Sequence, residues 1–388
     1  MHTISGSHIA GLGTVTGYGW GTQALWAGLT SSKPAATLQP SFGASTDDPG
    51  WIVRVPEGGR AEDGTTRFAR AMRAAAREAI NDALSRGWTP GARVGLIHAC
   101  VLGDLDMYPM VTPGSGGFTG RQYLSVTPST PVSLLMSEYG FHGPTMNLSA
   151  MCTSGSAAMI TAKLWLDSDM ADDVLVVSTD LSATPEVVRM FVQLGVAITD
   201  TDPLNACRPF QEGSRGFTFG EAAVATLMTS QRGTDAYASI LGGAMSHDAY
   251  HVTSVDPELT HVRRCVEEAL QAARVAGSDI EYMNAHGPGT RQCDAAEGQI
   301  AQTVVPEAQL YAVKPLVGHC QAAAGAAELA AALLGYEHGE IAASPHIAQP
   351  SVDQLIDGRT PMSGTHGLTL KTSLGMGGHN AALVLAPA

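Results

Sequence analysis

Two kinds of apolar pattern alternate along this chain of 388 residues. Residues 173–180 form a largely continuous apolar run, which is typical of a strand buried on both faces of a sheet. Residues 67–86 instead place apolar side chains at helical spacing, with arginines on the opposite face, which predicts an amphipathic helix. From residue 94 onward a predicted strand is repeatedly followed by a predicted helix.

Short apolar runs that end in loops predict the remaining strands. They lie at 94–101, 145–151, 221–229, 237–243, 280–287 and 309–319, with a hairpin-like pair over 367–386. Further helices are predicted at 153–168, 260–277, 293–304 and 321–338. Strands that alternate with helices imply an α/β architecture with mostly parallel sheets. Because both halves show the same order and end in paired strands, we expect a pseudo-duplicated fold. The Pro-, Gly- and Ser-rich segments 31–65 and 112–120 interrupt this order, and we expect them on the surface.

Composition and charge narrow the class of protein. The chain is 44% hydrophobic and only 15% charged, which indicates a high ratio of interior to surface or an extensive subunit interface. Its net charge of −14 argues against nucleic acid as a partner. No window has the 18 or more uninterrupted apolar residues of a membrane span, and the first residues lack the pattern of a signal peptide. We therefore expect a cytoplasmic protein.

The six cysteines are scattered and form no C-x-x-C pair, so neither a zinc site nor a disulfide framework is indicated. They are Cys100, Cys152, Cys207, Cys265, Cys293 and Cys320. Most fit the role of small buried apolar residues. Cys152 differs, because the strand predicted at 145–151 runs directly into it and a small-residue helix follows. This position predicts a strand-to-helix turn with the thiol at a helix N-terminus, which favours thiolate over thiol.

Three further segments place polar groups beyond strand ends, where sites assemble in α/β sheets. His286 lies in NAHGPGT (284–290), and His319 lies in KPLVGH (314–319). Each alone fits an ordinary loop histidine, and their spacing does not suit a metal site. Beside a nucleophilic cysteine, two neutral imidazoles can donate hydrogen bonds to a developing enolate or oxyanion. The Gly-rich turn 375–380 (GMGGHN) is either a plain tight turn or a source of backbone N–H groups for the same site.

These four segments, in this order, resemble the β-ketoacyl-acyl-carrier-protein synthases of Cys-His-His type. Residues 9–19, 206–223 and 246–254 also match, so the resemblance extends along nearly the whole chain. It implies a thiolase-like fold with two pseudo-duplicated αβαβα halves in a five-layered arrangement. The first half would span residues 1–235 and contain the nucleophile Cys152. The second would span 236–388 and contain both catalytic histidines.

The resemblance also implies roles for single residues. Cys152 would accept the acyl chain, and His286 and His319 would stabilise the enolate formed from a malonyl unit. Lys314 would set the electrostatic environment of the histidine pair through a buried polar network. Glu297 would be the acidic group that can pair with Lys314.

The oxyanion hole would be formed by the backbone N–H groups of Cys152 and Met376. Thr253 and Thr290 would contact the phosphopantetheine arm of an acyl carrier protein, and Leu374 and Met376 would line the substrate path. No metal and no cofactor of the enzyme itself is implied, because the substrates arrive on that carrier.

The chain departs from the family pattern at several positions. Met376 and Leu374 replace the usual Phe residues of the terminal turn, and Pro288 replaces a Thr of the first histidine loop. Because of these changes, the sequence does not specify which acyl chain the protein carries. They favour polyketide or unusual fatty acid synthesis. The basic residues that would receive an acidic carrier are not obvious. The candidates are Arg67, Arg70, Arg73 and Arg215. For most of them, the simpler interpretation is that they belong to a solvated helix face.

Three functions stay open at this point. The first is decarboxylative condensation in type II polyketide or fatty acid synthesis, by a homodimer or by a heterodimer with a chain-length-factor-like subunit. The second is a non-catalytic chain-length subunit, which would typically lack the cysteine. The third is acyl transfer to a non-malonyl acceptor. His319 disfavours the Cys-His-Asn enzymes that use acyl-coenzyme A, and the absence of Cys from 373–380 disfavours thiolases.

Overall fold

The structure is a computed structural model that describes residues 7–111, 120, 124, 126–231, 233–362 and 366–388. Within these residues, eleven strands form one mixed sheet, and two short strand pairs lie apart from it. The segment 112–120, expected on the surface, falls outside the described residues except for its last position. None of the helices in the described ranges is long and apolar enough to cross a membrane.

The large sheet consists of two arms with the same strand order. The first arm is β6-β5-β7-β8-β1 and the second is β11-β10-β14-β15-β9, so each follows the order 3-2-4-5-1 of its own five strands. The first arm comprises β1 (Ser7–Thr16), β5 (Val94–Ala99), β6 (Thr145–Leu148), β7 (Asp173–Asp180) and β8 (Ala222–Thr229). The second comprises β9 (Ala238–His247), β10 (Tyr282–Asn284), β11 (Gln309–Tyr311), β14 (Thr369–Gly375) and β15 (His379–Pro387). This identical order confirms the expected pseudo-duplication.

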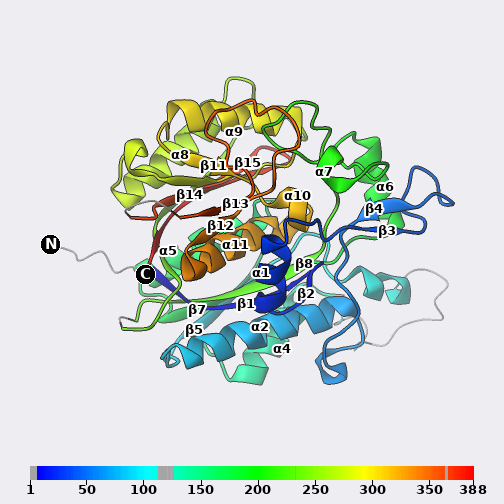
Figure 1. Ribbon diagram of the computed structural model, residues 1–388. Helices are drawn as coiled ribbons and strands as arrows, with labels where there is room; N and C mark the ends of the chain where they lie inside the picture. The colour runs from blue at the N-terminus through cyan, green and yellow to red at the C-terminus, as the bar shows by residue number, and fades with distance from the viewer. Residues whose placement is uncertain (1–6, 112–119, 121–123, 125, 232, 363–365) are drawn as a thin grey trace.

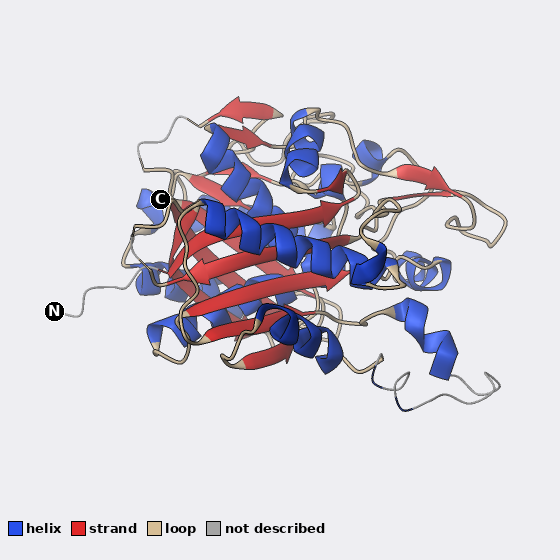
Figure 2. Cartoon of the chain, turned by 90° about the horizontal axis from the view of Figure 1, so that it is seen from below, coloured by secondary structure: helices blue, strands red, loops and turns tan. Residues whose placement is uncertain are grey.

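The arms lie as two layers joined along β1 and β9, which pair over three residues (Figure 1). Helices α5 (Ser154–Asp167) and α11 (Ala324–His338) lie between the layers and contact strands of both. On the outer faces lie α2 (Arg67–Ser85), α4 (Ser129–Tyr139), α8 (Thr260–Ala273) and α9 (Arg291–Thr303). The order helix, sheet, helix, sheet, helix is the expected five-layered arrangement, and Figure 2 shows the strands running alongside one another beneath these helices.

Sequence explains where these helices lie. Helix α11 is rich in Ala, and its residues 324–335 are all buried, because a helix covered on every side needs no polar face. Helix α2 buries only its apolar stripe, and the side chain of Thr66 caps its N-terminus by accepting from the N–H of Ala69. Gly13 on β1 lets α2 pack closely, since a Cβ there would lie 2.1 Å from the carbonyl oxygen of Ala75.

The remaining α-helices and strands are short. They are α1 (Thr22–Thr30), α6 (Pro185–Gln193), α7 (Pro203–Ala206), α10 (Lys314–Val317), β2 (Gly19–Trp20), β3 (Thr37–Gln39), β4 (Gly50–Ile52), β12 (Glu340–Ala342) and β13 (Arg359–Pro361). The run 309–319, predicted as a strand and loop, divides into β11 and α10, because Pro315 occupies the first turn of that short helix. The boundary expected near residue 235 stays a prediction.

Candidate active site

Cys152 lies on a tight turn between β6 and α5. Met151, directly before it, has φ of 51°, a left-handed conformation that is uncommon for a residue with a side chain. The hydroxyl of Ser154 holds this turn, because it accepts from the N–H of Ala150 at 2.9 Å and donates to the carbonyl of Met151 at 2.6 Å. The backbone strain therefore lies next to the predicted nucleophile, as at many functional positions.

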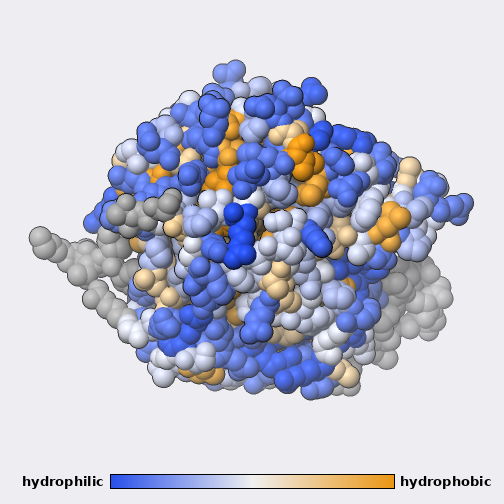
Figure 3. All heavy atoms as spheres, viewed as in Figure 1, coloured by the Kyte–Doolittle hydropathy of each residue, from blue (hydrophilic) through white to orange (hydrophobic). Residues whose placement is uncertain are grey.

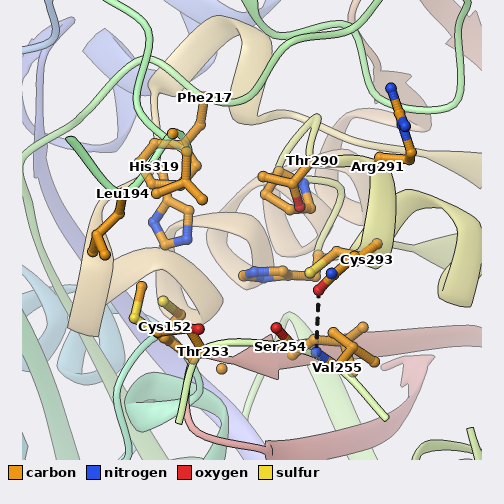
Figure 4. Close-up of a pocket in the computed structure, with 18 of the residues that line it drawn as sticks. Cys152, Leu194, Phe217, Thr253, Ser254, Val255, Thr290, Arg291, Cys293 and His319 are labelled. Atoms are coloured by element: carbon orange, nitrogen blue, oxygen red, sulfur yellow. Dashed lines mark hydrogen bonds between the residues drawn. The ribbon is translucent and has the colours of Figure 1, made fainter. Parts of the chain in front are cut away.

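One cavity of about 660 Å³ brings the predicted residues together. Cys152, His286 and His319 line it, and Figure 4 shows Cys152 and His319 pointing into the same hollow. The predicted substrate-contacting residues Thr253, Thr290, Leu374 and Met376 line it as well. Its volume lies within the range of small-molecule sites in proteins. The face of the molecule shown in Figure 3 is mostly hydrophilic with scattered apolar residues.

The two imidazoles lie beside each other, with ring centroids 5.3 Å apart and planes at 85°. Nδ1 of His286 lies 3.0 Å from the ammonium nitrogen of Lys314, and Nδ1 of His319 accepts from the N–H of Gln321 at 3.1 Å. Because both Nδ1 atoms face donors, each ring has its proton on Nε2. The phenyl ring of Phe217, 4.5 Å from His319 between centroids, holds that second ring in place.

Both histidines are neutral at physiological pH. Burial holds the pKa of His286 well below its usual range, and the neighbouring Lys314, His319 and Lys371 lower it further. Burial, followed by the charge of Lys314, likewise lowers the pKa of His319 well below its usual range. A neutral imidazole with its proton on Nε2 can donate a hydrogen bond but does not supply a positive charge.

The thiol of Cys152 differs from the expectation. Burial raises its pKa to about 11, while the N–H of Met376, which donates to the sulfur, and the charge of Lys314 lower it. The predicted preference for thiolate at the helix N-terminus is therefore wrong, because the desolvation of the buried sulfur outweighs the nearby donors. The contact with Met376 nevertheless places a backbone donor at the nucleophile.

This raised pKa gives a direct prediction for the reactivity of Cys152. The rate at which iodoacetamide alkylates Cys152 should rise about tenfold per pH unit between about pH 7 and 9, because the thiolate fraction rises in that way below the pKa. Peptide mass spectrometry at each pH would measure the rate. A rate that is already level across this range would instead show a thiolate at neutral pH.

Lys314 does not pair with Glu297, so this prediction is wrong. The fully buried ammonium of Lys314 contacts the carboxylate of Glu328 and the carbonyl of His286. Glu297 instead accepts from the N–H groups of His286 and Gly287, both at 2.8 Å. It also accepts from the hydroxyl of Thr372 at 2.6 Å. Glu297 therefore shapes the loop of His286, and Glu328 is the counter-charge of Lys314.

Sequence reasoning missed Glu328 and Lys371, which form an ion pair at 2.7 Å. Glu328 is an isolated charge in the Ala-rich helix α11, and Lys371 is the single charged residue of the buried strand β14. Such isolated charges are expensive to bury without a partner, and this is the signal that could have identified them.

The four arginines considered for carrier docking all pair with carboxylates of the chain itself. Arg67 pairs with Glu221 at 2.8 Å and Arg70 with Glu57 at 3.0 Å. The other two pairs are Arg73 with Glu138 at 2.5 Å and Arg215 with Asp200 at 2.9 Å. Of these four arginines, only Arg215 lines the cavity.

Comparison with known proteins agrees with this geometry. The chain matches the family profile "Beta-ketoacyl synthase, N-terminal domain" over residues 58–233 and "Beta-ketoacyl synthase, C-terminal domain" over 237–348. The fold and the matched profiles define an acyl-transferring condensing enzyme. The chain belongs to the β-ketoacyl synthase family, as the sequence resemblance predicted.

Relatives occur in both polyketide and fatty acid synthesis. A tetracenomycin polyketide synthase ketoacyl synthase alpha subunit from Streptomyces glaucescens is 29% identical, over 97% of this chain and 96% of that protein. The 3-oxoacyl-[acyl-carrier-protein] synthase 2 of Staphylococcus aureus is 28% identical, over 82% of this chain and 83% of that protein. The function is therefore that of a ketosynthase of the type II polyketide or fatty acid class.

Solved structures share the fold over the whole chain. A type II polyketide synthase ketosynthase, solved in complex with its acyl-carrier protein and bound to a hexaketide, has a TM-score of 0.84 at 23% identity. A ketosynthase in complex with its chain length factor, from Xenorhabdus doucetiae, has a TM-score of 0.85 at 21% identity. The alignments cover 99% of this chain and at least 98% of each structure, which confirms the thiolase-like architecture.

Proposed function

We propose that this protein condenses a Cys152-bound acyl chain with malonyl-acyl carrier protein, with loss of CO₂, in type II polyketide or specialised fatty acid synthesis. The main support is that a nucleophilic thiol and two Nε2–H donors line one cavity. A thiol alone would suit many acyl transfers. Two neutral donors beside it suit a reaction in which a carbonyl oxygen gains negative charge before the new bond forms.

In the first half-reaction, the sulfur of Cys152 attacks the carbonyl carbon of an acyl thioester, and the carrier thiol leaves with the proton from Cys152. Negative charge gathers on the carbonyl oxygen as the C–S bond forms. The backbone N–H groups of Cys152 and Met376 would stabilise this charge by donating hydrogen bonds to the oxygen. The N–H of Met376 already donates to the sulfur, so it lies next to the reacting atoms.

In the second half-reaction, the malonyl thioester loses CO₂, and the electron pair of the broken C–C bond forms an enolate. The Nε2–H groups of His286 and His319 would donate to its oxygen. The enolate carbon then attacks the acyl carbonyl carbon, the Cys152 sulfur leaves, and a β-ketoacyl thioester remains on the carrier. Cys152 regains its proton from water.

The lining of the cavity supports a carrier-borne substrate. Thr253 and Thr290 place hydroxyl groups along the path to Cys152, where a phosphopantetheine arm would need partners, and Pro288 contributes none. Leu374 and Met376 flank the nucleophile in place of aromatic rings. Since Met is flexible, this gate would adapt to acyl chains of unusual shape, which favours the specialised role.

Subunit pairing is supported by β6, which lies at the end of the sheet and, among the described strands, pairs with β5 alone. Residues 145–147 of this edge strand are exposed, and Met146 is 40% exposed. An uncovered edge strand with an apolar side chain is a typical site for strand pairing with a second subunit. We propose a dimer through this edge, either of two identical chains or with a chain-length-factor-like partner.

One experiment distinguishes this proposal from its alternatives. The protein is incubated with an acyl-carrier thioester and analysed by intact mass, and malonyl-carrier protein is then added while CO₂ and the β-ketoacyl product are measured. We expect one acyl group per chain, followed by CO₂ and product in equal amounts. Acylation without CO₂ release would indicate transfer to a non-malonyl acceptor. Failure to acylate would indicate a non-catalytic subunit.

A further inference from the structure

Lys371 is fully buried in the central part of the second sheet arm, on β14 between β10 and β15. A buried ammonium group is costly unless it is paired and hydrogen-bonded. Lys371 meets both conditions. Its nitrogen lies 2.7 Å from Oε2 of Glu328 and 3.3 Å from the hydroxyl oxygen of Ser373, and it donates to the carbonyl of Thr372.

The carboxylate of Glu328 lies between two lysines. Lys314 contacts Oε1, and Lys371 contacts Oε2. Within the described residues, Oε2 has no hydrogen bond of good geometry. Its ion pair with Lys371 is therefore the main interaction that offsets the cost of burying this oxygen. Lys314 in turn reaches Nδ1 and the carbonyl oxygen of His286. A continuous polar chain thus connects Lys371 to His286 through Glu328 and Lys314.

We propose that Lys371 is a positioning residue for His286, which acts by holding Glu328 so that Lys314 keeps donating to Nδ1 of that histidine. This inference rests on the proposed function, in which His286 must present its Nε2–H to the enolate. Without Lys371, the freed half of the Glu328 carboxylate would compete for the ammonium of Lys314 and draw it away from the ring.

The charges around His286 show what the loss of Lys371 would do. Lys314 and Lys371 contribute two positive charges, Glu328 and Glu297 two negative ones, and His319 is neutral. Removal of Lys371 would leave one uncompensated carboxylate beneath the ring. Because Lys371 is one of the charges that lower the pKa of His286, that pKa would then rise. Once Nδ1 of His286 carries a proton, it can no longer accept the hydrogen bond that Lys314 donates.

The test is the pH dependence of malonyl-carrier decarboxylation in the Lys371→Met variant. Met keeps most of the side-chain length and removes the charge. We expect the acid limb of the profile to move to higher pH, so that the loss of activity relative to wild type is larger at pH 6 than at pH 8. Acylation of Cys152, which does not use the histidine donors, should stay within about threefold of wild type.

Lys163→Met is the matched control, because Lys163 is a buried lysine on α5, paired with Asp167 at 3.0 Å and remote from the cavity lining. It should change thermal stability without moving the acid limb. A Lys371→Met profile lowered equally at every pH, or unchanged from wild type, would overturn the proposal. If wild type itself released no CO₂, the proposed function would fail instead.

A second measurement needs no folded Lys371 variant. In ¹⁵N-histidine spectra of wild type, the ring of His286, assigned by its absence from His286→Ala, should remain the neutral Nε2–H tautomer at pH 6. A protonated ring, or a proton on Nδ1, would overturn the proposal even if Lys371→Met failed to fold.

Discussion

Cys152→Ala is expected to abolish the acyl-enzyme and to reduce condensation by roughly 10⁴-fold or more, because Cys152, of the two cysteines that line the described cavity, is the one whose sulfur accepts from the N–H of Met376. The side chain loses only its sulfur, and the turn that positions it is held by Ser154 and by backbone groups. The fold should therefore persist. Intact-mass analysis after incubation with an acyl-carrier thioester would show the acyl group on wild type and no added mass on the variant.

Cys265→Ala provides the control for this experiment. Cys265 is a buried cysteine on α8, outside the cavity lining, and its thiol contacts the carbonyl of Ala244 at 3.3 Å. Its replacement should leave acylation and condensation close to wild type. Retention of the acyl group by Cys152→Ala would mean that another residue is the nucleophile, and proteolytic mapping of the mass would identify it.

His286→Ala and His319→Ala are each expected to slow condensation by about 10²- to 10³-fold, while Cys152 still becomes acylated. Each variant removes one Nε2–H donor, and one preorganised donor to a developing oxyanion contributes about this factor. Acylation should change far less, because its oxyanion would be stabilised by backbone N–H groups. Measurement of both half-reactions, by intact mass and by CO₂ release, would separate the two effects.

His379→Ala tests whether this loss is specific. His379 lies on β15 beside the Gly-rich turn, its ring packs against His247 at 4.9 Å between centroids, and it does not line the cavity. This variant should condense at nearly the wild-type rate. Equal losses in acylation and in CO₂ release for His286→Ala or His319→Ala would contradict the assignment of these donors to the decarboxylation step.

Local sequence was sufficient to predict most elements of the fold. The strand at 173–180 has the predicted bounds, and α2 ends one residue before its prediction, because continuous apolar runs and helical spacing reflect burial directly. The predictions were less accurate at 309–319 and at 321–338. In the latter segment a 3₁₀ turn over Gln321–Ala323 precedes α11. Short segments near a site follow their long-range contacts more than their own pattern.

The sequence by itself determined the family and the reactive residues that line the cavity, since Cys152, His286, His319 and Met376 belong to short motifs in a fixed order. Only the tertiary structure decided how their charges are arranged. It paired Lys314 with Glu328 in place of Glu297, added Lys371 from a distant strand, and buried the thiol of Cys152 so that its pKa rises to about 11. Electrostatic partners and desolvation depend on distances between segments far apart in the chain, and no local pattern specifies those distances.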